Sequence, residues 1–239
     1  MQKIDVLNAP YALDILSKYM KEQTGKEIKG FKRTSPFKAL IGTMLSLRAR
    51  GATVERVATS LFERATTPQE ILDMPIEELS GLLRPLGHVN RRTKFVRATC
   101  EDLIGRFQGR VPGDMDELLS LPGVGRKTAN LTLDAGYGHT TMTVDTHVHR
   151  IMNIWGYVQT RNANETEIVL REKLPRKYWK FFNPLLVGFG NLVCWPASPK
   201  CHSCPLQSLC PKHGVKVPLQ HQASKSVALK GLKPRRSAA

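Results

Sequence analysis

The sequence lacks long hydrophobic runs, an apolar leader segment and, in its last part, acidic residues. No stretch approaches the roughly 18 consecutive apolar residues that can cross a membrane. The first ten residues, MQKIDVLNAP, contain no apolar run of the signal-peptide kind. We therefore expect an intracellular protein that does not use a membrane. Its hydrophobic content of 41% is sufficient for one large core or two small ones.

The absence of acidic residues after Glu172 concentrates positive charge towards the end of the chain. The formal net charge is +16, and twelve of the 36 Lys and Arg residues lie from Lys173 onward. Such a basic region is typical of proteins that bind a polyanion such as DNA or RNA. Residues 213–239 are expected to form a basic, disordered tail that contacts nucleic acid non-specifically.

The period-two alternation of a half-buried strand is also missing, so we expect an all-α protein. Apolar residues instead recur every three or four positions. Ser35-Pro36 and Thr67-Pro68 are typical helix starts. The expected helices lie at about 10–24, 36–51, 54–62, 68–74, 76–83, 90–108, 117–121, 126–133, 146–156, 164–174 and 178–193. The three tryptophans are expected in the core or against the cysteine-rich segment: Trp155, Trp179 and Trp195.

A glycine-rich turn, Leu121-Pro122-Gly123-Val124-Gly125, leads directly into a segment that can be helical. Glycine is unfavourable within a helix, so the second helix should begin after Gly125 and complete a helix-hairpin-helix. With no Cβ at Gly123 or Gly125, the turn can approach another backbone closely. Its unpaired N–H groups can then point towards an anion such as a phosphate. Such a turn can grip a nucleic-acid strand without reading its sequence.

Lys127 and Asp145 are candidate catalytic residues. Lys127 lies in the first turn of the predicted helix, where the helix dipole and any desolvation favour a neutral, nucleophilic amine. Asp145 follows an apolar approach eighteen residues later and can cap the next helix. Alone, such residues are more often a solvated lysine and a simple N-cap. Their joint occurrence behind a Gly-x-Gly turn favours the catalytic interpretation.

Four of the five cysteines form the pattern Cys194-x6-Cys201-x2-Cys204-x5-Cys210. Prolines between them exclude a continuous helix, so we expect a loop that wraps around one object. An intracellular chain is not expected to oxidise these thiols to disulfides. Tetrahedral zinc and a [4Fe-4S] cluster are both compatible with the spacing. Cys100 stands apart in a helical pattern and is interpreted as a small buried hydrophobic residue.

Taken together, LPGVGRKTAN, VDTH and the cysteine spacing resemble the endonuclease III family of helix-hairpin-helix DNA glycosylases and abasic-site lyases. The resemblance covers about residues 30–212. It implies an all-α, two-domain fold with an iron–sulfur cluster loop and a substrate cleft between the domains. Residues 30–139 would form a six-helix bundle, and residues 1–29 with 140–212 a cluster domain. It also favours a [4Fe-4S] cluster over zinc, held by Cys194, Cys201, Cys204 and Cys210.

The same resemblance implies a base-excision-repair enzyme that removes oxidised pyrimidines from double-stranded DNA. Lys127 would attack C1′ of a flipped, damaged nucleotide and form a Schiff base, after which β-elimination cleaves the strand. Asp145 would stabilise positive charge at the sugar or help to deprotonate the amine. The nucleotide must be extruded because chemistry at C1′ is blocked within the stack. We expect a monomer in the cytoplasm, associated with the nucleoid.

The resemblance also indicates which residues contact DNA. Phosphate contacts are expected in the hairpin, from Gly123, Val124, Gly125, Arg126 and Thr128. Arg48 departs from the family pattern, because it stands where a glutamine usually inserts into the duplex. His88 likewise replaces a leucine wedge. Because arginine can donate to guanine, the lesion and opposite-base preferences could differ from those of the family. His147 is a further candidate contact, against the more common structural role of a histidine at a helix start.

Two other functions are compatible with the sequence. A monofunctional relative would remove thymine or uracil opposite guanine, or an alkylated base, with Asp145 activating water. Lys127 argues against this alternative, because such relatives often have another residue there, whereas Arg48 leaves it open. A non-catalytic DNA-binding module would use only the hairpin and the basic surface, and would need neither Lys127 nor Asp145.

Overall fold

The computed structural model describes residues 7–47, 49 and 51–215, and its regular elements within these ranges are all helical. This confirms the predicted all-α class. Short 3₁₀ turns and one π-helical turn, Leu133–Tyr137, connect some of the α-helices. The α-helices are α1 (Ala9–Thr24), α2 (Pro36–Ser46), α3 (Gly51–Phe62), α4 (Pro68–Asp73), α5 (Ile76–Leu83), α6 (Val89–Phe107), α7 (Met115–Leu119), α8 (Arg126–Thr132), α9 (Thr146–Ile154), α10 (Ala163–Lys173) and α11 (Trp179–Leu192).

Local sequence determines several helix starts. At α2, the Ser35 side chain accepts a hydrogen bond from Lys38 N at 3.3 Å, and Pro36 occupies the first helical position. At α4, Thr67 and Glu70 form a capping box in which each side chain accepts from the other residue's backbone N–H. Both predicted starts are confirmed, because each satisfies backbone donors that the first turn leaves unpaired.

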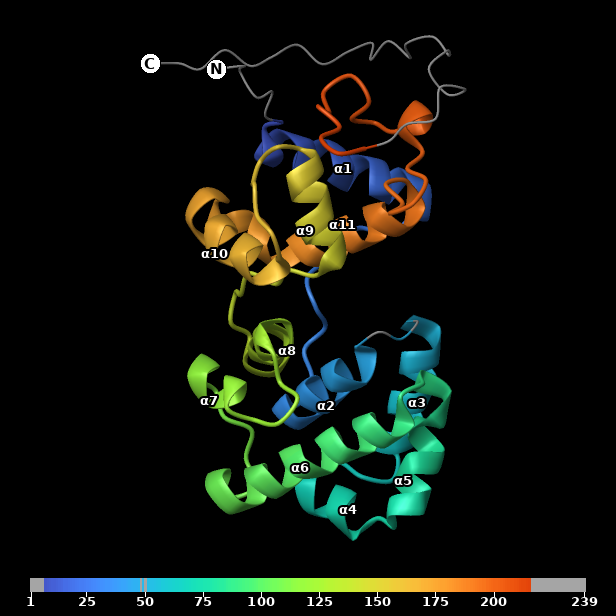
Figure 1. The fold of residues 1–239 in the computed structure, drawn as a ribbon, viewed down its shortest axis with the longest axis vertical. Coiled ribbons are helices and arrows are strands. Elements are labelled where there is room, and N and C mark those ends of the chain that lie inside the picture. The colour runs from blue at the N-terminus through green and yellow to red at the C-terminus, as the bar shows by residue number, and fades with distance from the viewer. Residues whose placement is uncertain (1–6, 48, 50, 216–239) are drawn as a thin grey trace.

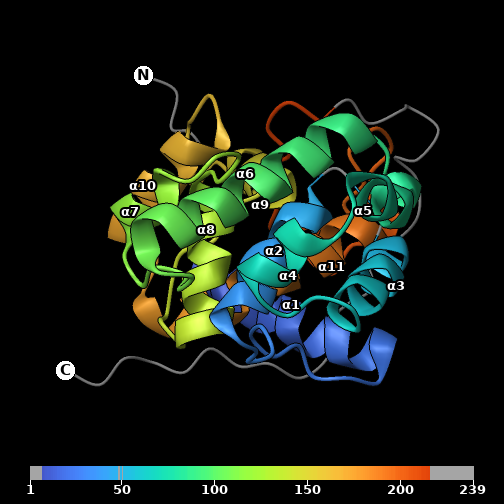
Figure 2. The same ribbon diagram turned by 90° about the horizontal axis from the view of Figure 1, so that it is seen from below.

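The described helices form two groups, each with its own apolar core. One core collects buried residues from α1, α9, α10 and α11, with Trp155 and Phe182 among the largest. The other collects residues from α2 to α8. Figure 1 shows the group of α1 and α9–α11 above the group of α2–α8. The segments that follow α1 and precede α9 join the two groups, and Figure 2 gives the perpendicular view. These separate cores support a division into two domains at 29/30 and 139/140, which stays a prediction.

The end of α2 differs from the sequence-based expectation. The helix was expected to reach Gly51, but it ends at Ser46, and Leu47 is extended with φ −61° and ψ 118°. Gly51 instead begins α3. The physical cause is Arg92 on α6, whose guanidinium donates to the carbonyl oxygens of Met44, Leu45 and Leu47. A side chain thus takes the place of the next helical turn as hydrogen-bond partner.

None of the described helices is both long and apolar enough to cross a membrane. Most of the predicted basic tail lies outside the described residues, which end at Val215.

Candidate active site

The hairpin between α7 and α8 contains two glycines that differ in their backbone conformation and surroundings. Gly123 has a φ of +75°, and a Cβ there would lie 2.8 Å from the Phe95 ring. Both the backbone conformation and the packing therefore require glycine. Gly125 is the N-cap of α8, in an extended conformation, and a Cβ there would meet no described atom within 4 Å. The face in front of Gly125 is open to a ligand.

The first turn of α8 presents backbone donors beside Lys127. The bond from Ala129 N to Gly125 O, at 2.9 Å, is the first of the helix, so the N–H groups of the three preceding residues point out of it. Gly125 has no side chain with which to cap them. Lys127 belongs to this turn, and its side chain is 36% exposed. An anion at this end of α8 would thus lie close to the lysine.

Asp145 lies opposite Lys127 at the start of α9. Its Oδ1 accepts a hydrogen bond from Val148 N at 3.0 Å, which confirms the predicted N-cap. Its Oδ2 lies 3.8 Å from Lys127 Nζ. The Asp145 side chain is only 10% exposed. A partly exposed amine and a sheltered carboxylate from two different helices therefore meet beside the open turn.

A second set of contacts runs from the start of α9 to the cysteine-rich loop. Arg150 donates to the carbonyl oxygen of Cys194 at 2.7 Å, and its other terminal nitrogen lies 3.8 Å from the Cys194 sulfur. The same guanidinium lies 3.3 Å from His147 Nδ1. Burial lowers the pKa of the His147 imidazole; the Asp145 charge opposes this shift, and the charges of Arg150 and Lys127 add to it. The net effect favours a neutral imidazole beside the lysine and the carboxylate.

The four clustered cysteines line one small cavity at the edge of the core formed by α1 and α9–α11. All are free thiols. Burial and, to a smaller extent, the neighbouring thiols raise the pKa of Cys204 to about 12. As placed in the described structure, the side chains do not converge tightly enough to form a metal-binding group. Four unpaired sulfurs around one cavity nevertheless fit a metal centre, because a bound cation would compensate the thiolate charge that burial disfavours.

Comparisons with known proteins show the family to which this chain belongs. Residues 41–176 match the HhH-GPD superfamily of base excision DNA repair proteins. The chain is also 40% identical over 196 residues to Endonuclease III of Thermotoga maritima, a match that spans 80% of this chain and 92% of the relative. The chain belongs to the endonuclease III family.

Solved structures of endonuclease III bound to DNA share the fold. A non-covalent endonuclease III–DNA complex superposes with a TM-score of 0.76 at 33% identity, covering 84% of this chain and 93% of that one. A trapped covalent endonuclease III–DNA intermediate with an estranged adenine gives 0.75 at 34% identity, with the same coverage. The predicted family and its all-α helix-hairpin-helix fold are thereby confirmed.

The hairpin residues expected to bind DNA differ in what they expose. Val124 and Thr128 are buried, with exposed fractions of 8% and 1%, and Val124 N already donates to Leu121 O. Gly123 and Gly125 are exposed. Arg126 has its guanidinium bonded to Glu167 of α10. Only the backbone of the turn is therefore turned outward without a competing partner in the described structure, and the individual DNA contacts stay predictions.

Of the two positions that depart from the endonuclease III pattern, only His88 lies within the described residues. Arg48 lies outside the described residues. His88 is exposed at the start of α6, with a φ of +49°, a conformation that a non-glycine side chain seldom adopts. A cavity of about 280 Å³ lies beside it, lined by residues from α2, α6 and Gly123. Backbone strain of this kind often marks functional positions.

Arg92 is a residue that the sequence analysis missed. It is only 8% exposed, and besides the three carbonyls at the end of α2 and in its C-cap it donates to Gly87 O and Leu86 O, at 3.2 and 3.1 Å. It thus joins the end of α2 to the turn that carries His88. The only available signal was a basic residue on the apolar stripe of α6, which the pattern alone does not distinguish from a solvated arginine.

The tryptophans divide between the two predicted surroundings: Trp155 and Trp179 belong to the core, and Trp195 lies on the cysteine loop. Trp155 is buried at 1%, and Trp179 packs against the same core. Trp195 is 48% exposed, with the Lys200 ammonium 5.5 Å from its ring centroid. The ring therefore lies at the surface of the cysteine loop rather than in the core.

Proposed function

We propose that this chain is a base-excision-repair DNA glycosylase with abasic-site lyase activity, which acts as a monomer on oxidised pyrimidines in double-stranded nucleoid DNA. Membership of the endonuclease III family supports the reaction class. The observation that carries the residue assignment is the 3.8 Å approach of Lys127 Nζ to Asp145 Oδ2 beside the open hairpin turn. A non-catalytic DNA-binding module would gain nothing from this pair.

In the proposed reaction the backbone of the hairpin binds the phosphates that flank the damaged nucleotide. The N–H groups at the start of α8 supply the donors, and the absence of a Cβ at Gly125 allows the DNA backbone to approach. These contacts read no bases. They hold the strand while the damaged nucleotide leaves the stack, which exposes C1′ to Lys127.

Lys127 then forms a bond from its amine nitrogen to C1′ as the glycosidic bond breaks, and the base leaves with the bonding electron pair. The attached nitrogen then gives up one proton, which Asp145 can accept, and the sugar ring opens as O4′ takes up a proton, which leaves a protonated Schiff base. Removal of a C2′ proton then expels the 3′ phosphate, and the strand is cleaved. Hydrolysis of the Schiff base returns the amine.

Asp145 keeps its charge close to this centre because α9 fixes its orientation. With Oδ1 held by Val148 N, Oδ2 is directed towards Lys127 and towards the positive charge that develops at the sugar. The same oxygen can accept a proton from the amine. One side chain thus serves both as a helix cap and as the electrostatic partner of the nucleophile.

We further propose that Cys194, Cys201, Cys204 and Cys210 hold a [4Fe-4S] cluster. The four free thiols around one cavity, the cysteine spacing and the family membership support this assignment. When bound, such a cluster supplies a metal-thiolate anchor for a loop that has little regular structure of its own. Arg150 connects that loop to α9, the helix that Asp145 caps.

Borohydride trapping tests the proposed function. Wild-type protein, Lys127→Ala and the control Lys18→Ala, an exposed lysine on α1, would be incubated with duplexes that contain thymine glycol, an abasic site or a thymine opposite guanine. We expect a covalent adduct with the first two duplexes for wild type and Lys18→Ala, and none for Lys127→Ala. Base release from the mismatch without an adduct would instead support a monofunctional enzyme. Tight binding without either product would support a binding module.

A further inference from the structure

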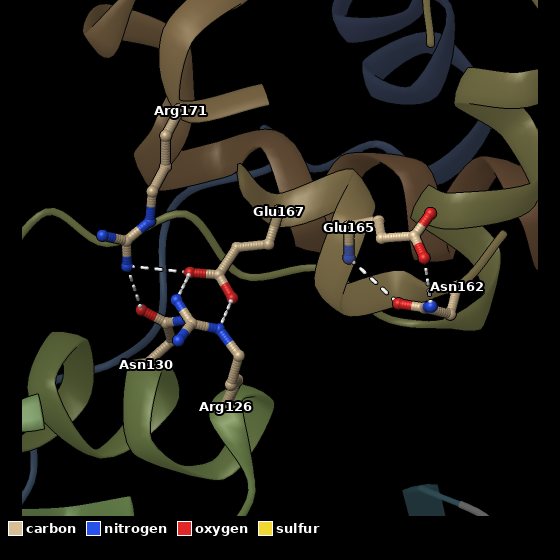
Figure 3. Close-up of polar contacts among 6 residues, drawn as sticks. All are labelled: Arg126, Asn130, Asn162, Glu165, Glu167 and Arg171. Atoms are coloured by element: carbon tan, nitrogen blue, oxygen red, sulfur yellow. Dashed lines mark hydrogen bonds and ion pairs between the residues drawn. The ribbon is translucent and has the colours of Figure 1, made fainter. Parts of the chain in front are cut away.

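Glu167 of α10 is a buried carboxylate held between two arginines (Figure 3). Its side chain is 3% exposed. Arg126 of α8 donates to both carboxylate oxygens, from Nε at 2.6 Å and from Nη2 at 2.9 Å. Arg171, one turn further along α10, lies 2.8 Å from the carboxylate through its Nη2. The same Arg171 nitrogen lies 3.4 Å from Asn130 Oδ1, so the network contacts α8 at two points one turn apart.

This arrangement fixes α8 against α10 in both distance and rotation. A bidentate arginine–carboxylate pair accepts little angular freedom, unlike a single hydrogen bond. The second contact, from Arg171 to Asn130, prevents α8 from pivoting about Arg126. Because Ala129 of α8 belongs to one apolar core and Leu170 of α10 to the other, the network also joins the two groups of helices.

The residue before Glu167 makes the matching contact with α9. Thr166 Oγ1 lies 2.7 Å from His149 Nδ1, one turn after Asp145, and His149 N in turn donates to Asp145 O. Two consecutive residues of α10 therefore contact the helix that begins at Asp145 and the helix that carries Lys127. In this way α10 acts as a common support for both halves of the catalytic pair.

An arginine such as Arg126 is unfavourable at the first position of a helix unless a negative charge lies beside it. A cation there faces the positive end of the helix dipole, which is unfavourable, and α8 has no acidic residue in its first turn. Glu167 supplies the missing negative charge, and its hydrogen bonds raise the pKa of the Arg126 guanidinium. A buried ion pair contributes little net stability compared with apolar packing. Its main effect here is therefore to fix the position of α8.

We propose that Glu167 is a positioning residue for the reaction: by holding Arg126 it fixes the first turn of α8, and with it Lys127, at its distance from Asp145. This inference rests on the proposed function, because it assumes that Lys127 is the nucleophile. It assigns no contact with substrate to Glu167. The carboxylate acts only through Arg126 and through Arg171, which in turn contacts Asn130.

The test compares Glu167→Gln with Glu172→Gln, an exposed glutamate on the same helix, in the full chain. Schiff-base formation on an abasic duplex is trapped with borohydride at saturating enzyme, and affinity is measured separately on a duplex with an uncleavable abasic analogue. For Glu167→Gln we expect trapping to slow by about tenfold or more, since small displacements of a reacting group cost that much. Affinity should stay equal or increase, because the change removes a negative charge and releases Arg126. A loss of folding would instead weaken binding and trapping together.

Arg126→Lys and the double variant Arg126→Lys/Glu167→Gln complete the experiment. Arg126→Lys keeps the charge but not the bidentate pair, so it should slow trapping as well, and it carries the test if thermal melting shows that Glu167→Gln is unfolded. If Glu167 acts through Arg126, the double variant should be no slower than the slower single variant. A wild-type trapping rate in the folded variants, or an equal loss in Glu172→Gln, would overturn the positioning role alone. Absence of an adduct with wild type would overturn the proposed function and this inference with it.

Discussion

Asp145 faces Lys127 with one carboxylate oxygen and caps α9 with the other. Oδ2 lies 3.8 Å from Lys127 Nζ, while Oδ1 accepts from Val148 N at 3.0 Å. The cap holds the carboxylate in place, so its orientation towards the lysine does not depend on the lysine. This separation of two roles within one side chain makes them individually testable, since asparagine can replace the cap but not the charge.

Asp145→Asn is therefore expected to retain the fold and lose catalysis. Asparagine caps a helix about as well as aspartate, so the free energy of unfolding should change by less than about 0.5 kcal/mol. Base excision under single-turnover conditions should slow by about a hundredfold, the scale reported for removing one electrostatic contact to a transition state. Asp145→Ala should show the same catalytic loss and an additional destabilisation of about 1 kcal/mol, because the cap is lost too. An excision rate near wild type in Asp145→Asn would refute the assignment.

Replacing one clustered cysteine should remove the metal, whereas replacing Cys100 should not. Purified wild-type protein is expected to be brown, with about four iron and four sulfide ions per chain. Cys204→Ser should lose most of both. Cys100→Ala, at a fully buried thiol outside the cluster, should keep its iron and sulfide at a cost of about 1 kcal/mol in stability. Elemental analysis and sulfide assay measure this, and a colourless wild type with one zinc per chain would contradict the cluster.

Local signals in the sequence were sufficient for most helices and for the positions of Lys127 and Asp145. Ser35-Pro36 and the Thr67 capping box mark their helices because the hydrogen bonds involved join residues three or four positions apart. Lys127 and Asp145 were likewise placed at their helix starts by neighbouring residues. Their approach to 3.8 Å was not available from any local pattern, because it depends on how α8 and α9 pack; the sequence offered only their joint occurrence and the family resemblance.

The residues that the sequence analysis missed act over long separations. Glu167 and Arg171 are four residues apart on a helix, a spacing typical of an exposed surface pair. Glu167 is nevertheless buried where α8 packs against it, while Arg171 stays 39% exposed. Arg92 similarly has the pattern of an ordinary charged residue on α6, and its hydrogen bonds reach carbonyls more than forty positions earlier. Tertiary packing, which periodicity does not encode, determines both roles.

Arg92→Ala is predicted to destabilise the protein by roughly 2–4 kcal/mol, because it leaves buried carbonyl oxygens without a donor. Arg91→Ala is the matched control. Arg91 is exposed and lies over the Phe95 ring at 5.3 Å, a contact worth less than about 1 kcal/mol at an exposed site. Urea-induced unfolding would measure the difference. Equal losses in the two variants would show that the carbonyl contacts of Arg92 contribute no more than a surface interaction.

The pH dependence of stability should reveal Asp134, which is buried in the π-helical turn after α8. Burial raises the pKa of its carboxyl above the ordinary value of 3.8, and the charges of Lys180 and Arg33 offset this only in part. The folded state therefore holds this proton to higher pH than the unfolded chain does. The free energy of unfolding should fall as pH rises from about 3.8 through the folded-state pKa, and the loss persists at neutral pH.

Asp134→Asn should remove this loss, because the amide resembles the protonated acid and can still accept a hydrogen bond from Thr141 N. At neutral pH the variant is expected to melt at a higher temperature than wild type, and the two should converge as pH falls towards 4. Asp73→Asn, at the exposed end of α4, serves as the control and should show no such convergence. Thermal melting over this pH range measures the effect. A lower melting temperature for Asp134→Asn at neutral pH would mean that Lys180 and Arg33 stabilise the ionised carboxylate by more than its burial costs.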